Sequence, residues 1–408
     1  MTQQYLTVTI EKIKYLVLSV FILYVFWYQY AIGEVSGAIS ILGVLMVGFE
    51  LLSIRRLRYY RGISFVFIFL FISVIMGFFF SQDIKLFSQL VQRILKYCIP
   101  MICTYSYIGG NRDRFKNVMG IIVISITLLS LYSFASDATV TATGAISVGN
   151  LNTNTFSCYI FIGVMSAIYL IEESSKKLVK CLFWFVLFVF FVVQINSASR
   201  RGFLILLFCI ITYIHSLIFL KNKNNIIYKI LTISTILIGL VIIIDNLESL
   251  MGDTVLWQRF FHNQTKGDQL RKLYQGVAFS LFSQNPVFGN GFGCVQSTIG
   301  MYSHSLYFEL LACCGLLGTI LILFPIMRRC IRFWKLSNNN QFEIRDRMQQ
   351  RILSIWCIAM LMIGIAVTFI YDADFYLLLA IIAARKNIDD FIVRNLVNQN
   401  YLEASEND

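Results

Sequence analysis

The sequence is poor in charged residues, since only 14% of its 408 residues are Asp, Glu, Lys or Arg, whereas 58% are hydrophobic and 15% are aromatic. The mean hydropathy is +0.71. This balance excludes an ordinary soluble domain and indicates a polytopic membrane protein. A convincing internal repeat is also missing, which argues against a transporter built from inverted repeats.

Patterns that hold metals or form disulfide frameworks are missing as well. The ten cysteines include no C-x-x-C pair, and the three histidines do not cluster. Most cysteines lie in or beside apolar runs, where a thiol behaves as a small hydrophobic group. Only Cys294 falls in an expected external loop, with no obvious partner. We therefore predict no disulfide framework, no metal site and no cofactor.

Apolar runs of about 20 residues, the length that crosses a bilayer, recur about twelve times along the chain. They cover residues 15–32, 35–53, 62–80, 86–108, 117–135, 154–171, 178–195, 202–220, 226–244, 303–327, 352–371 and 373–385. The fold class predicted is an all-α polytopic membrane protein with about twelve transmembrane helices in a single domain, residues 1–408. The first run lacks a small-residue cleavage site and is interpreted as a span, not a removable signal peptide.

Every second connection between these runs is strongly basic. The basic connections are residues 12–14, 55–61, 112–116, 176–180, 221–229, 328–351 and 385–394. Loops rich in Lys and Arg stay in the cytoplasm, so we expect these connections and both termini on the cytoplasmic side. Residues 328–351 form the longest basic loop. The net charge of +12 is then mainly a topology signal, and we expect no nucleic-acid partner.

One short external connection, residues 196–202, breaks this rule because it carries Arg200 and Arg201. Two guanidinium groups side by side form a receptor for phosphate, since Arg offers a fixed fork of donors and stays charged. The alternative is that both side chains only reach lipid headgroups at the membrane surface.

The largest external segment, residues 245–302, is predicted to hold amphipathic helices that cap the bundle. In its second half one apolar stripe recurs at spacings of three and four. The stripe consists of Leu270, Leu273, Tyr274, Val277, Ala278 and Leu281. Arg271 and Lys272 lie on the opposite, polar side, and the alternative for both is the solvated face of a lid helix.

The glycines of residues 285–293 superficially resemble a nucleotide-binding loop. A dinucleotide fingerprint needs a strand before it and a helix after it in a βαβ unit, and neither fits here. We interpret these glycines as residues that give the backbone the conformational freedom to form a tight loop that returns to the membrane. His304 follows at the external mouth of the next run, and Glu309 lies deeper in that run.

Polar residues also follow one face of the fourth apolar run, at Gln89, Gln92, Arg93 and Lys96. Ionisable residues inside a span are costly, so this stripe is expected to face a water-filled cavity or the bundle interior. For the same reason Glu309 is a functional candidate. Its alternative is an ion pair with Arg93 or Lys96.

Four stretches, in this order, resemble the O-antigen polymerase and O-antigen ligase superfamily, the bacterial Wzy-type and WaaL-type membrane enzymes. They are Gly149–Asn154, Ser197–Gly202, Leu270-Arg271 with the turn Pro286–Gly293, and His304-Ser305 with Glu309 and Gly315–Gly318. Ser305 replaces the family's Asn. The resemblance covers residues 149–320, and the preceding part is similar only in hydropathy.

This resemblance implies a GT-C-like helical bundle in the bacterial cytoplasmic membrane, with its active site on the external face. It implies a metal-independent glycosyltransferase whose donor is an undecaprenyl-pyrophosphate-linked oligosaccharide. The other expected partners are membrane lipid and a chain-length regulator. The pyrophosphate-binding candidates are Arg93, Arg200, Arg201 and Arg271, and the catalytic candidates are His304, Arg271 and Glu309. His304 would deprotonate or orient the acceptor hydroxyl, or help to hold pyrophosphate.

The expected function is a polysaccharide polymerase, whose acceptor is a second lipid-linked repeat unit. A ligase would share the donor but use lipid A–core as acceptor, and the sequence contains no clean discriminator between the two. A flippase or transporter of lipid-linked oligosaccharide fits less well, because the clustered cations lie on one side of the membrane.

Overall fold

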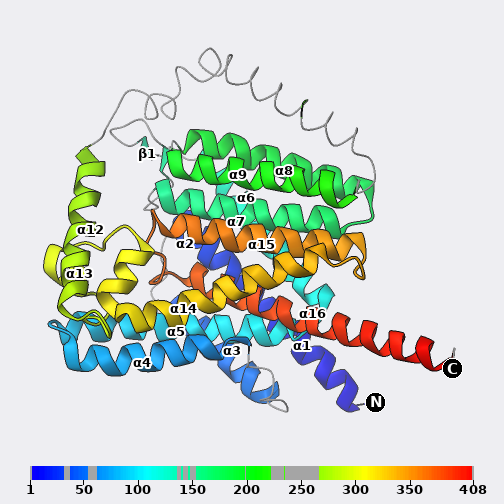
Figure 1. Ribbon diagram of the computed structural model, residues 1–408, viewed down its shortest axis with the longest axis horizontal. Coiled ribbons are helices and arrows are strands. Elements are labelled where there is room, and N and C mark those ends of the chain that lie inside the picture. Colours follow the sequence, from blue (N-terminus) through cyan, green and yellow to red (C-terminus); the bar gives the residue numbers. More distant parts are fainter. Residues whose placement is uncertain are drawn as a thin grey trace.

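The computed structural model describes residues 2–31, 37–53, 62–135, 139–140, 146–147, 153–197, 199–221, 234 and 266–406. These residues are almost entirely helical (Figure 1). The helices are α1 (Thr2–Leu23), α2 (Gln29–Ala31), α3 (Ala38–Ser53), α4 (Ser64–Phe80), α5 (Ile84–Ile108), α6 (Arg112–Ala135), α7 (Thr153–Glu173), α8 (Lys177–Asn196), α9 (Arg200–Ser216), α12 (Lys266–Gln284), α13 (Cys294–Ile299), α14 (Leu306–Asn338), α15 (Ile344–Gly364) and α16 (Ala373–Glu406). Short π-helical turns, η1 (Tyr24–Tyr28) and η3 (Leu217–Lys221), follow α1 and α9. Two strands, β1 (Thr139–Val140) and β2 (Ile146–Ser147), pair antiparallel.

Five described helical segments are long and apolar enough to cross a membrane: α6, α7, α8, α9 with η3, and α14. Helices at the outside of the bundle expose large apolar side chains. On α8, Leu182, Phe185 and Phe188 are 59%, 63% and 62% exposed. Apolar patches of this kind are unusual on a protein surrounded by water and suit contact with lipid. The structure thus supports an α-helical membrane protein.

Every predicted span overlaps a described helix except residues 226–244, of which only residue 234 is described. The count of twelve spans and the GT-C-like class stay predictions. The eleventh predicted span, 352–371, is too long at its end, because α15 stops at Gly364 and residues 365–372 are not helical. The twelfth, 373–385, is too short, because α16 continues to Glu406.

Residues 328–351, which we predicted as a basic loop, are mostly helical. Helix α14 continues to Asn338 and α15 begins at Ile344. Arg and Lys are good helix formers, so basic residues can extend a helix beyond the membrane. Two of them also bind the end of α14. The Nε atom of Arg347 donates to the carbonyl oxygen of Ser337 (3.0 Å), and the Nε atom of Arg351 donates to the Ser337 hydroxyl (3.0 Å).

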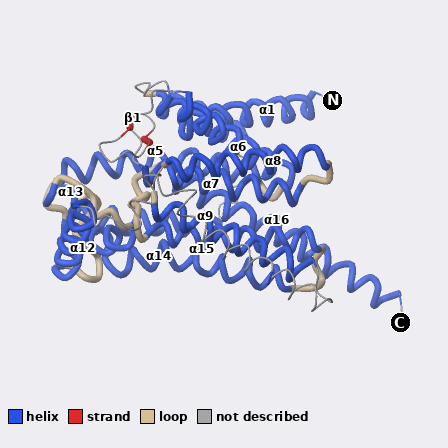
Figure 2. Tube along the Cα trace, turned by 90° about the horizontal axis from the view of Figure 1, so that it is seen from above, coloured by secondary structure: helices blue, strands red, loops and turns tan. Residues whose placement is uncertain are grey.

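The long helices lie side by side, and the two views agree on what stands at their ends (Figure 1, Figure 2). The start of α1 and the end of α16 lie at one end of the bundle, and α12 and α13 lie at the other. Helix α7 is enclosed by the bundle, because 89% of its most apolar 18-residue stretch is buried. Helix α8 is peripheral, because only 17% of the corresponding stretch is buried.

A break in α14 joins this helix to the glycine turn that precedes α13. Gly315 interrupts α14 with φ 62° and ψ −169°, which leaves helical N–H and C=O groups without their usual partners. The turn supplies replacements through four backbone hydrogen bonds. The donors and acceptors are Asn290 N to Ala312 O (2.9 Å), Gly291 N to Cys313 O (2.9 Å), Leu316 N to Pro286 O (2.8 Å) and Leu317 N to Val287 O (3.1 Å).

The glycines of this turn have the conformation that the sequence predicts. Gly289, Gly291 and Gly293 have φ values of 75°, 84° and 83°, the left-handed region that favours glycine. A Cβ on Gly289 would lie 2.5 Å from the backbone of Cys313. The interpretation of the segment as a tight loop is therefore confirmed, and its glycines allow two backbones to meet.

Candidate functional site

Arg200 and Arg201 occupy the first turn of α9, which is anchored to α7. The Ser199 hydroxyl caps α9 by accepting from Gly202 N–H (3.3 Å) and donates to Asn154 Oδ1 (3.0 Å). The N-terminus of a helix carries partial positive charge and favours anions. The turn therefore combines two guanidinium groups with a helix end of the same electrostatic sign.

Buried polar side chains of α7 and α8 also support the first turn of α9. The Gln194 amide donates to Ser157 Oγ (3.0 Å) and Ser197 Oγ (3.2 Å), and all three side chains are buried. A Cβ at Gly202 would lie 2.4 Å from Ser157 Cβ. The Ser-Arg-Gly pattern therefore has a packing role in addition to the chemistry of its arginines.

His304 is the one non-glycine residue with positive φ (56°) in the part of the chain that the structure describes. Such strain tends to gather at functional sites. Its ring lies against two aromatic rings, with centroids 4.7 Å from Tyr302 and 5.9 Å from Tyr274 of α12. The side chain is half-buried.

Two of the pyrophosphate-binding candidates, Arg201 and Arg271, affect the pKa of His304. Burial lowers the pKa of His304, and the positive charges of Arg271 and Arg201 lower it further. These three residues come from α12, from the start of α9 and from the loop before α14, so the fold brings together what the sequence separates. The neighbouring Lys272 is exposed, in line with a solvated face, whereas Arg271 is half-buried.

Glu309 is buried and binds backbone and side chains of three segments. It accepts from Ser303 N–H (2.9 Å) and from the Tyr371 hydroxyl (3.1 Å), which itself accepts from Gly293 N–H (3.2 Å). Among the described residues Glu309 forms no ion pair with Arg93 or Lys96, the alternative that we considered, and Arg93 binds Asp372. Glu309 is thus placed to hold the loop that carries His304.

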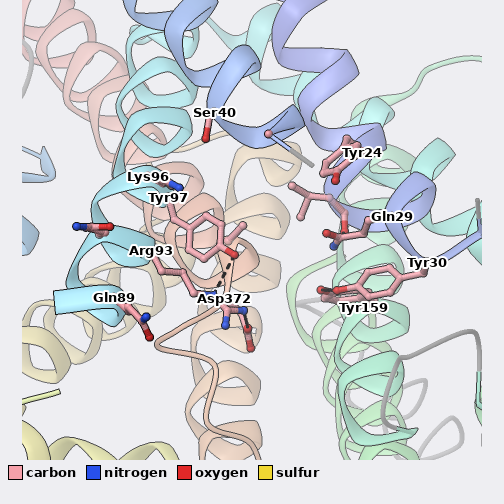
Figure 3. Close-up of a pocket in the computed structure, with 14 residues that line it drawn as sticks. Tyr24, Gln29, Tyr30, Ser40, Gln89, Arg93, Lys96, Tyr97, Tyr159 and Asp372 are labelled. Carbon is pink, nitrogen blue, oxygen red and sulfur yellow. Dashed lines mark hydrogen bonds and ion pairs between the residues drawn. The ribbon is translucent and has the colours of Figure 1, made fainter. Parts of the chain in front are cut away.

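The polar stripe of α5 lines a cavity of about 640 Å³, as the sequence predicts for ionisable residues in a span (Figure 3). Arg93 donates to the Tyr97 hydroxyl (3.2 Å) and lies 3.5 Å from Asp372. Tyr30 and Tyr159 face Arg93 from the other side of the cavity, with their hydroxyls 3.0 Å apart. The remaining polar lining residues are Tyr24, Gln29, Ser40, Gln89, Gln92 and Lys96.

Tyr302 contacts His304 and is affected by the charges of two residues that line this cavity, Arg93 and Asp372. Its ring contacts His304, and burial raises the pKa of Tyr302, as do the charges of Asp372 and Glu309, whereas Arg93 lowers it. Arg201 and Arg271 thus act electrostatically on His304, and Arg93 acts on the neighbouring Tyr302. Tyrosine hydroxyls and amides beside cations suit a ligand that joins sugar to phosphate.

Sequence reasoning missed Asp372 and the tyrosines of the cavity. Burial raises the pKa of Asp372 to about 6, against the opposing effect of Arg93. A carboxylic acid in the expected external connection 371–374 was the available signal. It also missed the partner of Cys294, whose sulfur lies 3.5 Å from that of Cys313. Among the described residues no group of three His, Cys, Asp or Glu side chains could hold a metal ion.

Replacing Arg271 with Gln is expected to raise the pKa of His304, because one of the charges that disfavour the imidazolium is removed. Histidine-labelled protein contains three imidazoles, and His304→Gln identifies the signal to follow by NMR. Lys272→Gln, which removes an exposed charge one residue away, should leave the titration midpoint unchanged. An equal shift in both variants would contradict a specific effect of Arg271.

In comparisons with known proteins, no family model and no curated protein matches the chain.

Proposed function

We propose that the chain is a polysaccharide polymerase of the bacterial cytoplasmic membrane, acting at the external face, with O-antigen or capsule repeat units as substrates. The donor is an undecaprenyl-pyrophosphate-linked glycan, and the acceptor is a sugar hydroxyl of a lipid-linked repeat unit. Two observations carry the proposal: the positive charges of Arg201 and Arg271 act on His304, and Arg93 lines a polar cavity.

In the proposed reaction the acceptor hydroxyl oxygen attacks the anomeric carbon of the donor sugar. The bond from that carbon to the pyrophosphate oxygen breaks, and the lipid pyrophosphate leaves with the bonding electrons. Arg201 and Arg271 stabilise the negative charge that grows on the leaving group. His304 takes the proton of the attacking hydroxyl, a role that suits an imidazole held neutral near pH 7 by its lowered pKa.

The cavity lined by Arg93 is proposed to hold the sugar part of a substrate. Its tyrosine rings offer faces for a pyranose, and its amides and hydroxyls offer hydrogen-bond partners. Arg93 is placed by Tyr97 and Asp372 and would contact the glycan or the pyrophosphate oxygens. Glu309 is assigned a positioning role, because its contacts hold Ser303 and Tyr371.

Arg201 is expected to matter more than Arg200, although the family resemblance favours Arg200. The reason is that Arg201, and not Arg200, is among the charges that lower the pKa of His304. We expect Arg201→Ala to reduce glycan polymerisation at least about 100-fold, the effect of removing one transition-state donor. Arg200→Ala should retain most activity. The measurement is polymer length on gels of cell-surface glycan, and the reverse order of effects would contradict this assignment.

The proposed function is tested with purified protein and synthetic lipid-linked repeat units as the only substrates. A ladder of lengthening glycans is expected. Supplying lipid A–core as an alternative acceptor separates polymerase from ligase. Glycan found only on lipid A–core would replace the polymerase with a ligase, and neither product would remove both.

A further inference from the structure

A second cavity of about 640 Å³ lies between α4, the later half of α14 and α16. Its polar lining is cationic, since Arg328, Arg329, Arg332, Lys335 and Lys386 all contribute and no acidic residue does. Arg328 is about 24 residues after His304 in the chain, roughly 35 Å along a helix at 1.5 Å per residue. This cavity is therefore at the opposite end of the bundle from the candidate active site.

Some of these cations have partners of their own. Arg332 binds Asp390, and Arg329 binds the carbonyl oxygen of Gly62. For Arg328, Lys335 and Lys386 the described residues offer no ion-pair partner. Arg328 and Lys335 are exposed and Lys386 is half-buried, so three ammonium or guanidinium groups are available to an anion at the cavity.

An exposed apolar stripe runs along α14 up to these cations. Its members recur at spacings of three and four, so they share one face of the helix. They are Leu316 (52% exposed), Ile320 (50%), Phe324 (59%), Met327 (50%) and Ile331 (53%). Phe324 and Ile331 also line the cavity itself. The stripe therefore connects the cationic cavity with the apolar interior expected of the surrounding membrane.

We propose that this cavity binds an anionic phospholipid, with its phosphate against Arg328, Lys335 and Lys386 and an acyl chain along the apolar stripe of α14. Charge complementarity selects the anionic headgroup, and basic pockets between membrane helices are suited to it. The apolar stripe selects a lipid over a soluble phosphate, because burial of its side chains by an acyl chain is favourable. The proposal is independent of the proposed function.

The test is native mass spectrometry of the full chain, released from detergent, with phosphatidylglycerol or phosphatidylcholine of identical acyl chains. The protein should retain phosphatidylglycerol at least about 10-fold better, from charge complementarity at three cations. The variant Arg328→Gln, Lys335→Gln, Lys386→Gln should lose this preference. The control variant Lys176→Gln, Lys177→Gln, Lys180→Gln removes three charges that line no described cavity and should keep it.

Three outcomes would overturn the proposal. They are an unchanged preference in the Arg328, Lys335 and Lys386 variant, an equal loss in the control variant, or displacement of the lipid by an equal concentration of glycerol 3-phosphate. The second would indicate general surface charge, and the third a phosphate site without a lipid. Unfolding temperatures of both variants, measured in the same detergent, check that each is folded.

Discussion

Replacing Arg271 or His304 with alanine is expected to abolish glycan polymerisation while the protein still inserts into the membrane. Each variant removes a group from the cluster in which the charges of Arg271 and Arg201 act on His304. Loss of one preorganised charge-stabilising group costs about 10²- to 10³-fold in rate. The measurement is polymer length in cells that lack the native gene and express each variant at equal level.

Lys272→Ala is the matched control for this result. It removes a cation from the same helix and the neighbouring position, but its side chain is exposed to solvent. Polymer of normal length is expected from it. Full-length glycan from both the Arg271→Ala and His304→Ala variants would remove the site assignment, even if the protein proved to be a polymerase.

Replacing Gly315 with alanine is expected to prevent correct folding of the end of the bundle that carries α12 and α13 (Figure 1, Figure 2). The new Cβ would lie 2.4 Å from the carbonyl carbon of Val287, which is backbone and cannot swing aside. The φ of 62° adds strain of about 1–3 kcal/mol for a residue with a side chain. Separation of the turn from α14 would also break the backbone hydrogen bonds between them, so a large fall in unfolding temperature or in yield is expected.

Gly276→Ala controls for the general effect of replacing a helical glycine in this part of the chain. No atom lies within 4 Å of a Cβ built there. Alanine in a helix is favoured over glycine by about 0.5–1 kcal/mol, so this variant should be as stable as the natural chain or slightly more stable. Equal stability of the Gly315→Ala variant would show that the turn and α14 are not joined in the way described.

Hydropathy predicts most of the helices because helices that contact lipid, such as α8, need apolar side chains on their outer faces. This requirement is visible in the sequence as apolar runs. The basic residues after position 328 do not predict local structure. Their charge reports the expected side of the membrane but is compatible with a helix that continues past its surface. The same charges therefore predicted a loop where α14 and α15 have their final and first turns.

Contacts between distant segments were beyond sequence reasoning. The glycine turn can be predicted from the sequence. Its backbone hydrogen bonds with α14 around Gly315 cannot, because they join two segments that meet only in the folded chain. Asp372 is separated from Arg93 by most of the chain, so their pairing has no local signal. The polar stripe of α5, by contrast, has a local period. It predicted either a cavity or the bundle interior, and the stripe lines a cavity.

The stoichiometry of the purified reaction tests the proposed glycosyl transfer directly. Lipid-linked repeat units are incubated with the protein, and released undecaprenyl pyrophosphate is counted against glycosidic bonds formed. We predict one lipid pyrophosphate released for each bond, with glycan lengthening on a lipid carrier and none of either product from the Arg271→Ala variant. Glycan lengthening without release of lipid pyrophosphate, or equal activity in that variant, would contradict this prediction.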